Sequence, residues 1–373
     1  MFVIDGILVK CLALKIDLNM NCKITGTGSY IPELVQKNED FIKSAFYDNQ
    51  KVKLKHSNEI VIKKFKEITG ISERRYVNDE LKNSDMATIA AQRAIEDSGI
   101  NSEELDYIIL AQNFGDVTSK SNQCDMLPSI ASRVKYNLKI RNNNCVAYDV
   151  IFGCPGWVQG VIQAEAFIKS GIASKCLVIG SETLSRVVDP FDRDSMIYSD
   201  GAAACVIEKT DKNDGGRILS SAAQSHTFEE TYFLFYGQSY NPDLPQEINY
   251  IKMHGRKIYE FAISNVPLAM KSALDKSAVS IDKIKKVIIH QANEKMDEAI
   301  IHRFYKLYQM PVPDGIMPMS IHKLGNSSVA TVPTLLDLVI KGKLEGHEIL
   351  KGDFILLASV GAGMNINAIV YQY

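Results

Sequence analysis

Apolar runs of strand length alternate with helical patterns along the first half of the chain. The stretch 84–99 (SDMATIAAQRAIEDSG) predicts a helix with Ser84 as its N-cap and Gly99 as its stop, and it leads into the strand-like run DYIILAQN. Further along, the runs KCLVIGSE and AAACVIEK have the apolar character of buried strands. Helices that alternate with such strands indicate an α/β protein.

The second half of the chain repeats this order. VPLAMKSALDKSAVS and SSVATVPTLLDLVIKGK read as helices, KKVIIHQAN follows the first as a strand, and DFILLASVGAG and NAIVYQY follow the second. In both halves a helix, a strand ending in glycine and a closing strand come at corresponding places. This weak internal duplication predicts two similar α/β units about a pseudo-twofold axis. The polar stretch 209–216 (KTDKNDGG) best marks the boundary, so we expect units at 23–212 and 213–373.

The first 22 residues need a separate interpretation. MFVIDGILVKCLALKIDLNM is apolar, but charged residues interrupt it, and it has neither a basic start nor a small-residue cleavage site. We therefore expect neither a signal peptide nor a membrane span. Clear structure begins after Met20, at NCKITGTGSYIPE, so residues 1–22 are read as an N-terminal extension or as an overcalled start.

Composition and charge exclude several classes of protein. At 373 residues the chain is long enough for two core-bearing units, and its net charge of -2 without a basic block argues against nucleic acid as a partner. Its seven cysteines show no CxxC pair and no zinc-ligand spacing. Cys145, Cys176 and Cys205 lie in apolar, strand-like runs and read as core residues. We therefore expect reduced thiols in a cytoplasmic protein, without a metal or a cofactor and away from the membrane.

Cys154 stands out because of its position. The run 146–152 predicts a buried strand, Pro155 suits a first helical position, and the helical pattern that follows stops at Gly171. A thiol at a helix N-terminus faces unpaired N–H groups and the positive end of the dipole, and both favour the nucleophilic thiolate. A free cysteine is most often a small buried hydrophobe. The strand–Cys–Pro–Gly–helix context favours a nucleophile instead.

Three further sites lie at strand ends or loops of the second half. His290 ends the run KVIIHQAN, where α/β proteins place ligands, although a histidine there can also be purely structural. Asn326 precedes a helix and could be only its N-cap. Gly361 and Gly363 in SVGAGMN could form a simple turn, or could let the backbone approach a ligand and offer N–H groups.

Taken together, these motifs resemble the 3-oxoacyl-acyl-carrier-protein synthase III family of thiolase-fold condensing enzymes. The resemblance runs from about residue 23 to residue 373 through KITGTGSYIPE, TGISERR, the Cys154 segment, GSETLSRVVDPFDRDSMIYSDGAAA, HQAN, GNSSVATVP and the terminal glycine loop. It implies a thiolase-like fold of two pseudo-symmetric halves in five layers, α-β-α-β-α. It also implies a Cys154–His290–Asn326 triad, and an oxyanion hole formed by the backbone N–H groups of Cys154 and Gly363.

The resemblance implies a decarboxylating Claisen condensation in fatty acid or specialised lipid synthesis. Cys154 would take the acyl starter, and His290 and Asn326 would donate to the enolate oxygen left when malonyl-carrier loses CO₂. Two alternatives stay open. One is an acyltransferase or aromatic-polyketide-type enzyme that uses Cys154 with a different acceptor. The other is a catalytically silent partner subunit, against which the three triad residues argue, since function follows the site.

The same resemblance implies the partners, and departures from the family pattern concern them. Arg193 in DPFDR, Asn293 of HQAN and Lys295 would bind coenzyme A or the acyl carrier protein, although an arginine is usual at the last position. Lys64 and Ile68 replace a tryptophan and an arginine that sandwich adenine in the family, and the loop 113–128 is longer than usual. Leu127 matches a position that closes the partner's acyl pocket, which implies a homodimer.

Overall fold

The computed structural model describes residues 3–4, 7–8, 20–210 and 215–373. The expected boundary between residues 212 and 213 lies outside the described residues, as does most of the expected extension 1–22. Two separate mixed sheets, one from each half of the chain, organise the fold.

The N-terminal sheet has five strands. Their order across the sheet is β3 (Asn21–Tyr30), β9 (Asp200–Thr210), β8 (Lys175–Thr183), β6 (Tyr107–Ala111) and β7 (Val146–Val150). The strands β8, β6 and β7 run parallel, whereas β9 is antiparallel to both of its neighbours. Parallel neighbours need crossover connections, and the helices that the sequence places between these strands supply them.

The C-terminal sheet repeats most of this arrangement with four strands. Their order is β10 (Arg217–Ser225), β15 (Asn365–Gln372), β14 (Phe354–Gly361) and β13 (Ile284–Ile289). The strand β15 is antiparallel to both neighbours, as β9 is in the first sheet. The place that β7 takes in the first sheet is filled here by an irregular segment, since Val287 N–H donates to Ile316 O at 2.8 Å. The internal duplication predicted from the sequence is therefore present.

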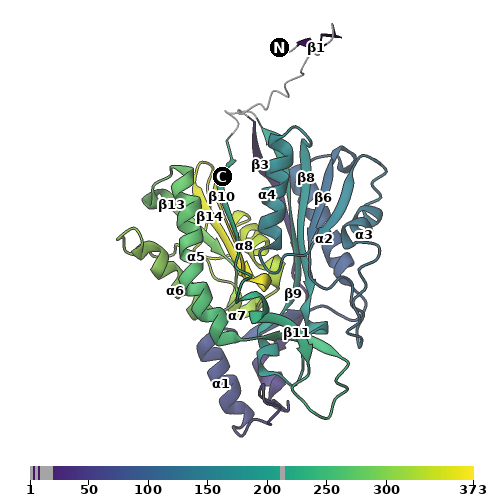
Figure 1. Ribbon diagram of the computed structural model, residues 1–373, viewed down its shortest axis with the longest axis vertical. Coiled ribbons are helices and arrows are strands. Elements are labelled where there is room, and N and C mark those ends of the chain that lie inside the picture. Colours follow the sequence, from purple (N-terminus) through teal and green to yellow (C-terminus); the bar gives the residue numbers. More distant parts are fainter. Residues whose placement is uncertain (1–2, 5–6, 9–19, 211–214) are drawn as a thin grey trace.

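Helices form three layers around the two sheets (Figure 1). The outer layer of the first half holds α2 (Asn83–Ser98) and α3 (Ile130–Asn137), and that of the second half holds α5 (Gly255–Ser277) and α6 (Glu294–Lys306). Between the sheets lie α4 (Gly156–Lys169) and α8 (Thr331–Ile340), each in contact with strands of both halves. The result is the five-layer thiolase-like order that the family resemblance implied.

Smaller elements complete the fold. The helical ones are η1 (Asn38–Phe41), α1 (Asn58–Thr69), η2 (Ser102–Glu104), η3 (Leu184–Arg186), η4 (Arg193–Ile197), η5 (Thr231–Phe233), η6 (Ile281–Lys283), α7 (Ile321–Leu324), η7 (Ser328–Ala330) and η8 (Ala362–Met364). Three antiparallel pairs join β1 (Val3–Ile4) to β2 (Ile7–Leu8), β4 (Leu34–Lys37) to β5 (Glu73–Tyr76), and β11 (Leu234–Gln238) to β12 (Asn249–Met253). Within the described ranges, no helix has the length and apolar character needed to cross a bilayer.

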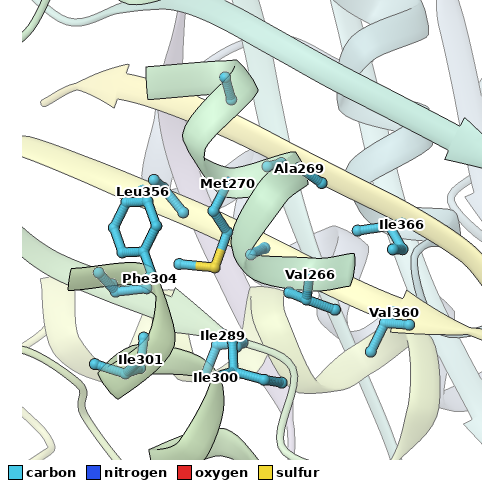
Figure 2. Packing of buried hydrophobic residues seen from close by; sticks show 14 of the residues in the cluster. Val266, Ala269, Met270, Ile289, Ile300, Ile301, Phe304, Leu356, Val360 and Ile366 are labelled. Carbon is cyan, nitrogen blue, oxygen red and sulfur yellow. The ribbon is translucent and has the colours of Figure 1, made fainter. Parts of the chain in front are cut away.

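Each sheet buries an apolar face under its outer helices. In the C-terminal half, Met270 of α5, Phe304 of α6 and Leu356 of β14 lie next to one another in one apolar cluster (Figure 2). All three side chains are at most 1% exposed. The helices α5 and α6 are thereby fixed to the sheet whose strand β13 leads into His290.

Two of the expected helix starts are corrected by the structure. The helix α2 has Lys82 as its N-cap, and the Asp85 carboxylate accepts from Lys82 N–H, while the Ser84 hydroxyl donates to Asp116 instead. The helix α5 begins at Gly255, earlier than the apolar pattern around VPLAMKSAL suggests. The expected stop at Gly99 is confirmed, since it takes a left-handed φ of 71°.

Candidate active site

Cys154 lies in the short turn between β7 and α4, as the sequence predicts. The strand ends at Val150, Pro155 is the N-cap, and the helix begins one residue later than expected. The turn packs against the loop that follows β14. A Cβ added to Gly153 would come within 2.6 Å of Ala362 N, and one added to Gly361 within 2.5 Å of Cys154 N. Only glycine at both positions lets the two backbones meet.

His290 is the first residue after β13. Its backbone N–H donates to Ala358 O at 2.9 Å, which ties it to the neighbouring strand β14. The side chain is buried, and its Nδ1 lies 2.6 Å from the Thr331 hydroxyl oxygen. That hydroxyl donates to Ser328 O at 2.9 Å, so its oxygen accepts from Nδ1–H of His290. The neutral ring therefore carries its proton on Nδ1 and has a free lone pair on Nε2.

Asn326 is held by backbone and side-chain hydrogen bonds. Its N–H donates to Ile197 O at 3.0 Å, and its carbonyl accepts from Ser199 N–H at 2.9 Å. The side-chain Oδ1 accepts from Ser328 N–H at 2.8 Å. Because that bond fixes the amide orientation, the Nδ2 hydrogens are the donors that remain for a ligand.

The three predicted triad residues line one cavity of about 600 Å³, together with Gly361. The rest of the wall is largely apolar. It is formed by side chains of α1, η4, the β11–β12 hairpin and α5, among them Phe65, Ile68, Ile197, Leu234, Met253 and Ile258. The site is thus an apolar cavity with a few convergent polar groups, the usual form of a small-molecule site.

The electrostatics correct one expectation. Desolvation raises the pKa of the Cys154 thiol to about 11, and the nearby Glu182 carboxyl adds to the rise, whereas a hydrogen bond from Ser328 opposes it. Burial also lowers the pKa of His290 to about 3. The expected thiolate is therefore wrong for the resting site. Desolvation raises the pKa of the Cys154 thiol by more than the donors at the helix N-terminus lower it. Cys154 is a thiol in the same cavity as a neutral imidazole.

The terminal glycine loop also differs from the expectation. Gly361 and Ala362 contact the turn that carries Cys154, whereas a Cβ on Gly363 would meet only the Asn365 side chain. Gly363 takes a left-handed φ of 73° inside η8 and does not line the cavity. The backbone placed next to Cys154 and its turn is thus that of Gly361 and Ala362.

The expected binding residues fall into two groups. Arg193 and Asn293 line the cavity, together with Lys64 and Ile68 of α1, and the Asn293 side chain also caps α6 by accepting from Met296 N–H. Lys295 is exposed on the first turn of α6 and is not part of the cavity wall. Leu127 lies away from the cavity in this chain and is 89% exposed.

Sequence reasoning missed the polar residues behind the triad. The Asn113 amide donates to Glu182 and to Ser328, and the Ser328 hydroxyl donates to Cys154. The Thr331 hydroxyl holds the His290 ring. Asn113 and Glu182 come at the ends of the strand-like runs DYIILAQN and KCLVIGSE. Because parallel strands end at the same edge of a sheet, that position was the available signal.

The fold is that of the thiolase-like condensing enzymes, and a thiol, an imidazole and a carboxamide line one cavity between its two halves. The model of the 3-oxoacyl-[acyl-carrier-protein (ACP)] synthase III family matches residues 148–227, and the model of its C-terminal part matches residues 274–373. The beta-ketoacyl-[acyl-carrier-protein] synthase III of Ehrlichia ruminantium (strain Welgevonden) is 30% identical over 344 residues, 92% of this chain and 96% of that protein.

Two further relatives cover the same range. The enzyme of that name from Aquifex aeolicus is 32% identical over 357 residues, 95% of this chain and 100% of its own length. The crystal structure of the synthase III from Thermus thermophilus superposes with a TM-score of 0.77 at 27% identity, covering 94% of this chain and 99% of that one. The chain belongs to the 3-oxoacyl-[acyl-carrier-protein] synthase III family of condensing acyltransferases. This membership favours condensation over the other acceptors considered from the sequence.

Proposed function

We propose that the protein condenses an acyl starter, carried on Cys154, with malonyl-acyl carrier protein, and releases CO₂ and a 3-oxoacyl-acyl carrier protein. The observation that carries this proposal is the single cavity into which Cys154, His290 and Asn326 all open. The relatives named above are beta-ketoacyl-[acyl-carrier-protein] synthases III.

In the first half-reaction the starter moves to the enzyme. Nε2 of His290, free of hydrogen because Nδ1–H binds Thr331, takes the Cys154 proton. The sulfur then attacks the starter thioester, and the new C–S bond replaces the bond to the first carrier, which leaves as a thiolate. The oxyanion that forms on the way would be held by Cys154 N–H and by the backbone of the Gly361–Ala362 segment.

In the second half-reaction malonyl thioester loses its carboxylate as CO₂. The electrons of the broken C–C bond form an enolate, whose oxygen accepts from Asn326 Nδ2 and from the proton now on Nε2 of His290. The incoming malonate carboxylate supplies a negative charge that favours the protonated ring. The carbanion attacks the acyl-Cys154 carbonyl, the thiolate is expelled, and it recovers its proton from His290. No proton is gained or lost by the enzyme over the cycle.

The residues that line the cavity mouth indicate which carrier delivers the acyl starter. Lys64 and Ile68 of α1 line the mouth where adenine would need an aromatic ring and a guanidinium. Arg193, exposed in the cavity wall, would offer one phosphate contact, and Lys295 is exposed on the first turn of α6. These groups suit the phosphopantetheine arm of an acyl carrier protein better than the adenine of coenzyme A.

We further propose a cytoplasmic homodimer. Leu127, an exposed apolar side chain near the end of the loop 113–128, would pack on a second copy of the chain. The described cysteines Cys22, Cys124, Cys145, Cys154, Cys176 and Cys205 are all free, which suits a reducing compartment.

The proposal is tested with intact-protein mass spectrometry. After incubation with a panel of acyl thioesters, the wild-type chain should gain one acyl mass, mapped to Cys154, and lose it when malonyl-acyl carrier protein is added. Cys154→Ala should gain none. Cys205→Ala, in the buried sheet, is the matched control and should acylate normally. An acyl group on another cysteine, or an adduct that malonyl-acyl carrier protein does not discharge, would contradict the proposal.

A further inference from the structure

The loop after Asn326 carries a serine that contacts all three triad residues, directly or through one bond. The hydroxyl of Ser328 donates to Sγ of Cys154 at 3.3 Å. Its backbone N–H donates to Oδ1 of Asn326, and its backbone carbonyl accepts from the Thr331 hydroxyl that holds His290. We infer that Ser328 is a fourth catalytic residue, whose hydroxyl stabilises the Cys154 thiolate during acyl transfer. This inference rests on the proposed role of Cys154 as the nucleophile.

The direction of the Ser328 hydroxyl bond is set from behind by Asn113. The Asn113 Oδ1 accepts from Gly153 N–H at 3.1 Å, so its amide hydrogens point the other way. One donates to Glu182 Oε1 at 2.5 Å and the other toward Ser328 Oγ at 3.5 Å. Because the serine oxygen accepts from Asn113, its own hydrogen is free for the sulfur.

The backbone at Ser328 supports a functional reason for this residue. Its φ is 52°, in the left-handed region that side-chain-bearing residues seldom occupy, and the residue is buried. Glycine would adopt this conformation without a steric cost. Strained positions of this kind concentrate at active sites, where the surrounding structure holds them in place.

A thiolate at Cys154 needs a hydrogen-bond donor because the wall around it is largely apolar. Cys154 is half-buried against a largely apolar wall. Among the described residues, the lysine and arginines that line the cavity are Lys64, Arg193 and Arg256, and all three are exposed to solvent on α1, η4 and α5. The hydrogen-bond donors at the sulfur must therefore come from neutral groups. Hydrogen bonds to a charged acceptor are about twice as strong as those between neutral groups, so the Ser328 hydroxyl gains strength as the thiolate forms.

The variant Ser328→Gly tests the role of the hydroxyl while leaving the backbone contacts of residue 328 in place. The variant keeps the positive φ, the N–H to Asn326 and the carbonyl to Thr331, and loses the donor to Cys154 together with the long 3.5 Å contact from the Asn113 amide. We expect the pH profile of Cys154 alkylation by iodoacetamide to move up by about one pKa unit, which is about tenfold slower alkylation below the pKa. Acyl transfer should slow similarly, whereas malonyl decarboxylation should persist. Ser327→Ala, the adjacent buried serine, is the matched control and should match the wild type.

A failure of this inference can be distinguished from a failure of the proposed function. Alkylation measures the reactivity of the Cys154 thiol even if the protein catalyses no condensation. An unshifted alkylation profile in folded Ser328→Gly would overturn the inference. So would an equal loss of decarboxylation, because it would mean that the loop had moved. Ser328→Ala, which keeps the strain but lacks the hydroxyl, is the second variant and should show the same shift.

Discussion

Tyr198 and Asn326 pair as neighbours in a parallel backbone bridge that crosses from one half of the chain to the other. Tyr198 belongs to the segment between η4 and β9, and Asn326 to the loop before η7. The bridge means that the N-terminal half fixes the position of an amide supplied by the C-terminal half. The paired side chains lie on one face, and both line the cavity.

Substitutions of Asn326 and His290 should affect the two half-reactions differently. Asn326→Ala should retain acylation of Cys154 and lose malonyl decarboxylation by about 10²–10³, the usual cost of one oxyanion donor. His290→Ala should slow both half-reactions, because its Nε2 first removes the thiol proton and then donates it, and loss of a general base typically costs about 10²–10⁴. Asn326→Asp should be worse than the alanine variant, since a carboxylate repels the developing charge. The measurements are acyl-enzyme mass and ¹⁴CO₂ release, and a decarboxylation rate unchanged in either alanine variant removes that residue from the role.

Restoring the adenine contacts should change the preferred starter. The double variant Lys64→Trp, Ile68→Arg should speed acylation from acyl-coenzyme A at low concentration, because each stacking or cation–π contact contributes about 0.5–2 kcal/mol, or about 2- to 30-fold. Acylation from the same acyl group on a carrier protein should hardly change. Lys63→Trp, on α1 but outside the cavity wall, is the control for a new surface aromatic. Faster use of coenzyme A than of carrier by the wild type would show that another surface binds the nucleotide.

Glu182 should make both the thiol and the fold sensitive to alkaline pH. Burial raises its pKa to about 8 from an ordinary value of 4.5. A raised folded pKa gives a stabilising contribution that is complete below pH 4.5 and is lost as the pH rises through 8. Glu182→Gln should therefore melt at a higher temperature than the wild type at pH 9, with the advantage shrinking toward pH 5. Its Cys154 should alkylate faster at pH 9, since the nearby negative charge is gone. Melting curves that stay parallel across this range would contradict the assignment.

The exposed leucine of the long loop should control assembly. Leu127→Asp should convert a dimer into monomers in analytical ultracentrifugation, because it places a charge where an apolar contact is expected. Leu350→Asp, at an exposed leucine near the C-terminal sheet, should leave the assembly unchanged. A wild-type chain that sediments as a monomer at micromolar concentration would refute the homodimer directly.

Local patterns predicted the position of Cys154 but not the charge state of its sulfur. The strand, the proline and the helix around Cys154 are adjacent in sequence, so periodicity alone located the turn. The pKa of the thiol depends instead on Glu182, Ser328 and the loss of water, which tertiary packing brings together. An argument from the helix N-terminus sees only the local contribution and therefore gave the wrong charge state.

The terminal glycine loop shows a second limit of sequence reasoning. SVGAGMN contains two glycines, and which of them meets the nucleophile depends on the register of β14 on β15. Gly361 pairs with Asn365 at the end of that ladder, which turns the Gly361–Ala362 backbone toward Cys154 and leaves Gly363 inside the turn. Register and φ of this kind are set by three-dimensional packing. The same holds for the positive φ of Ser328, which no pattern in GNSSVATVP reveals.

The middle layer of helices has a consequence for how the molecule melts. One apolar cluster takes Ile109 and Val178 from the first sheet, Leu335 from α8, and Ile288 and Leu357 from the second sheet. Neither half can therefore bury the inner face of its own sheet, and separating the halves would expose this cluster to water. Loss of one half removes the partner surface of the other, so the two must unfold in one cooperative transition. Calorimetry of the whole chain should show a single peak of heat absorption, despite the duplicated architecture.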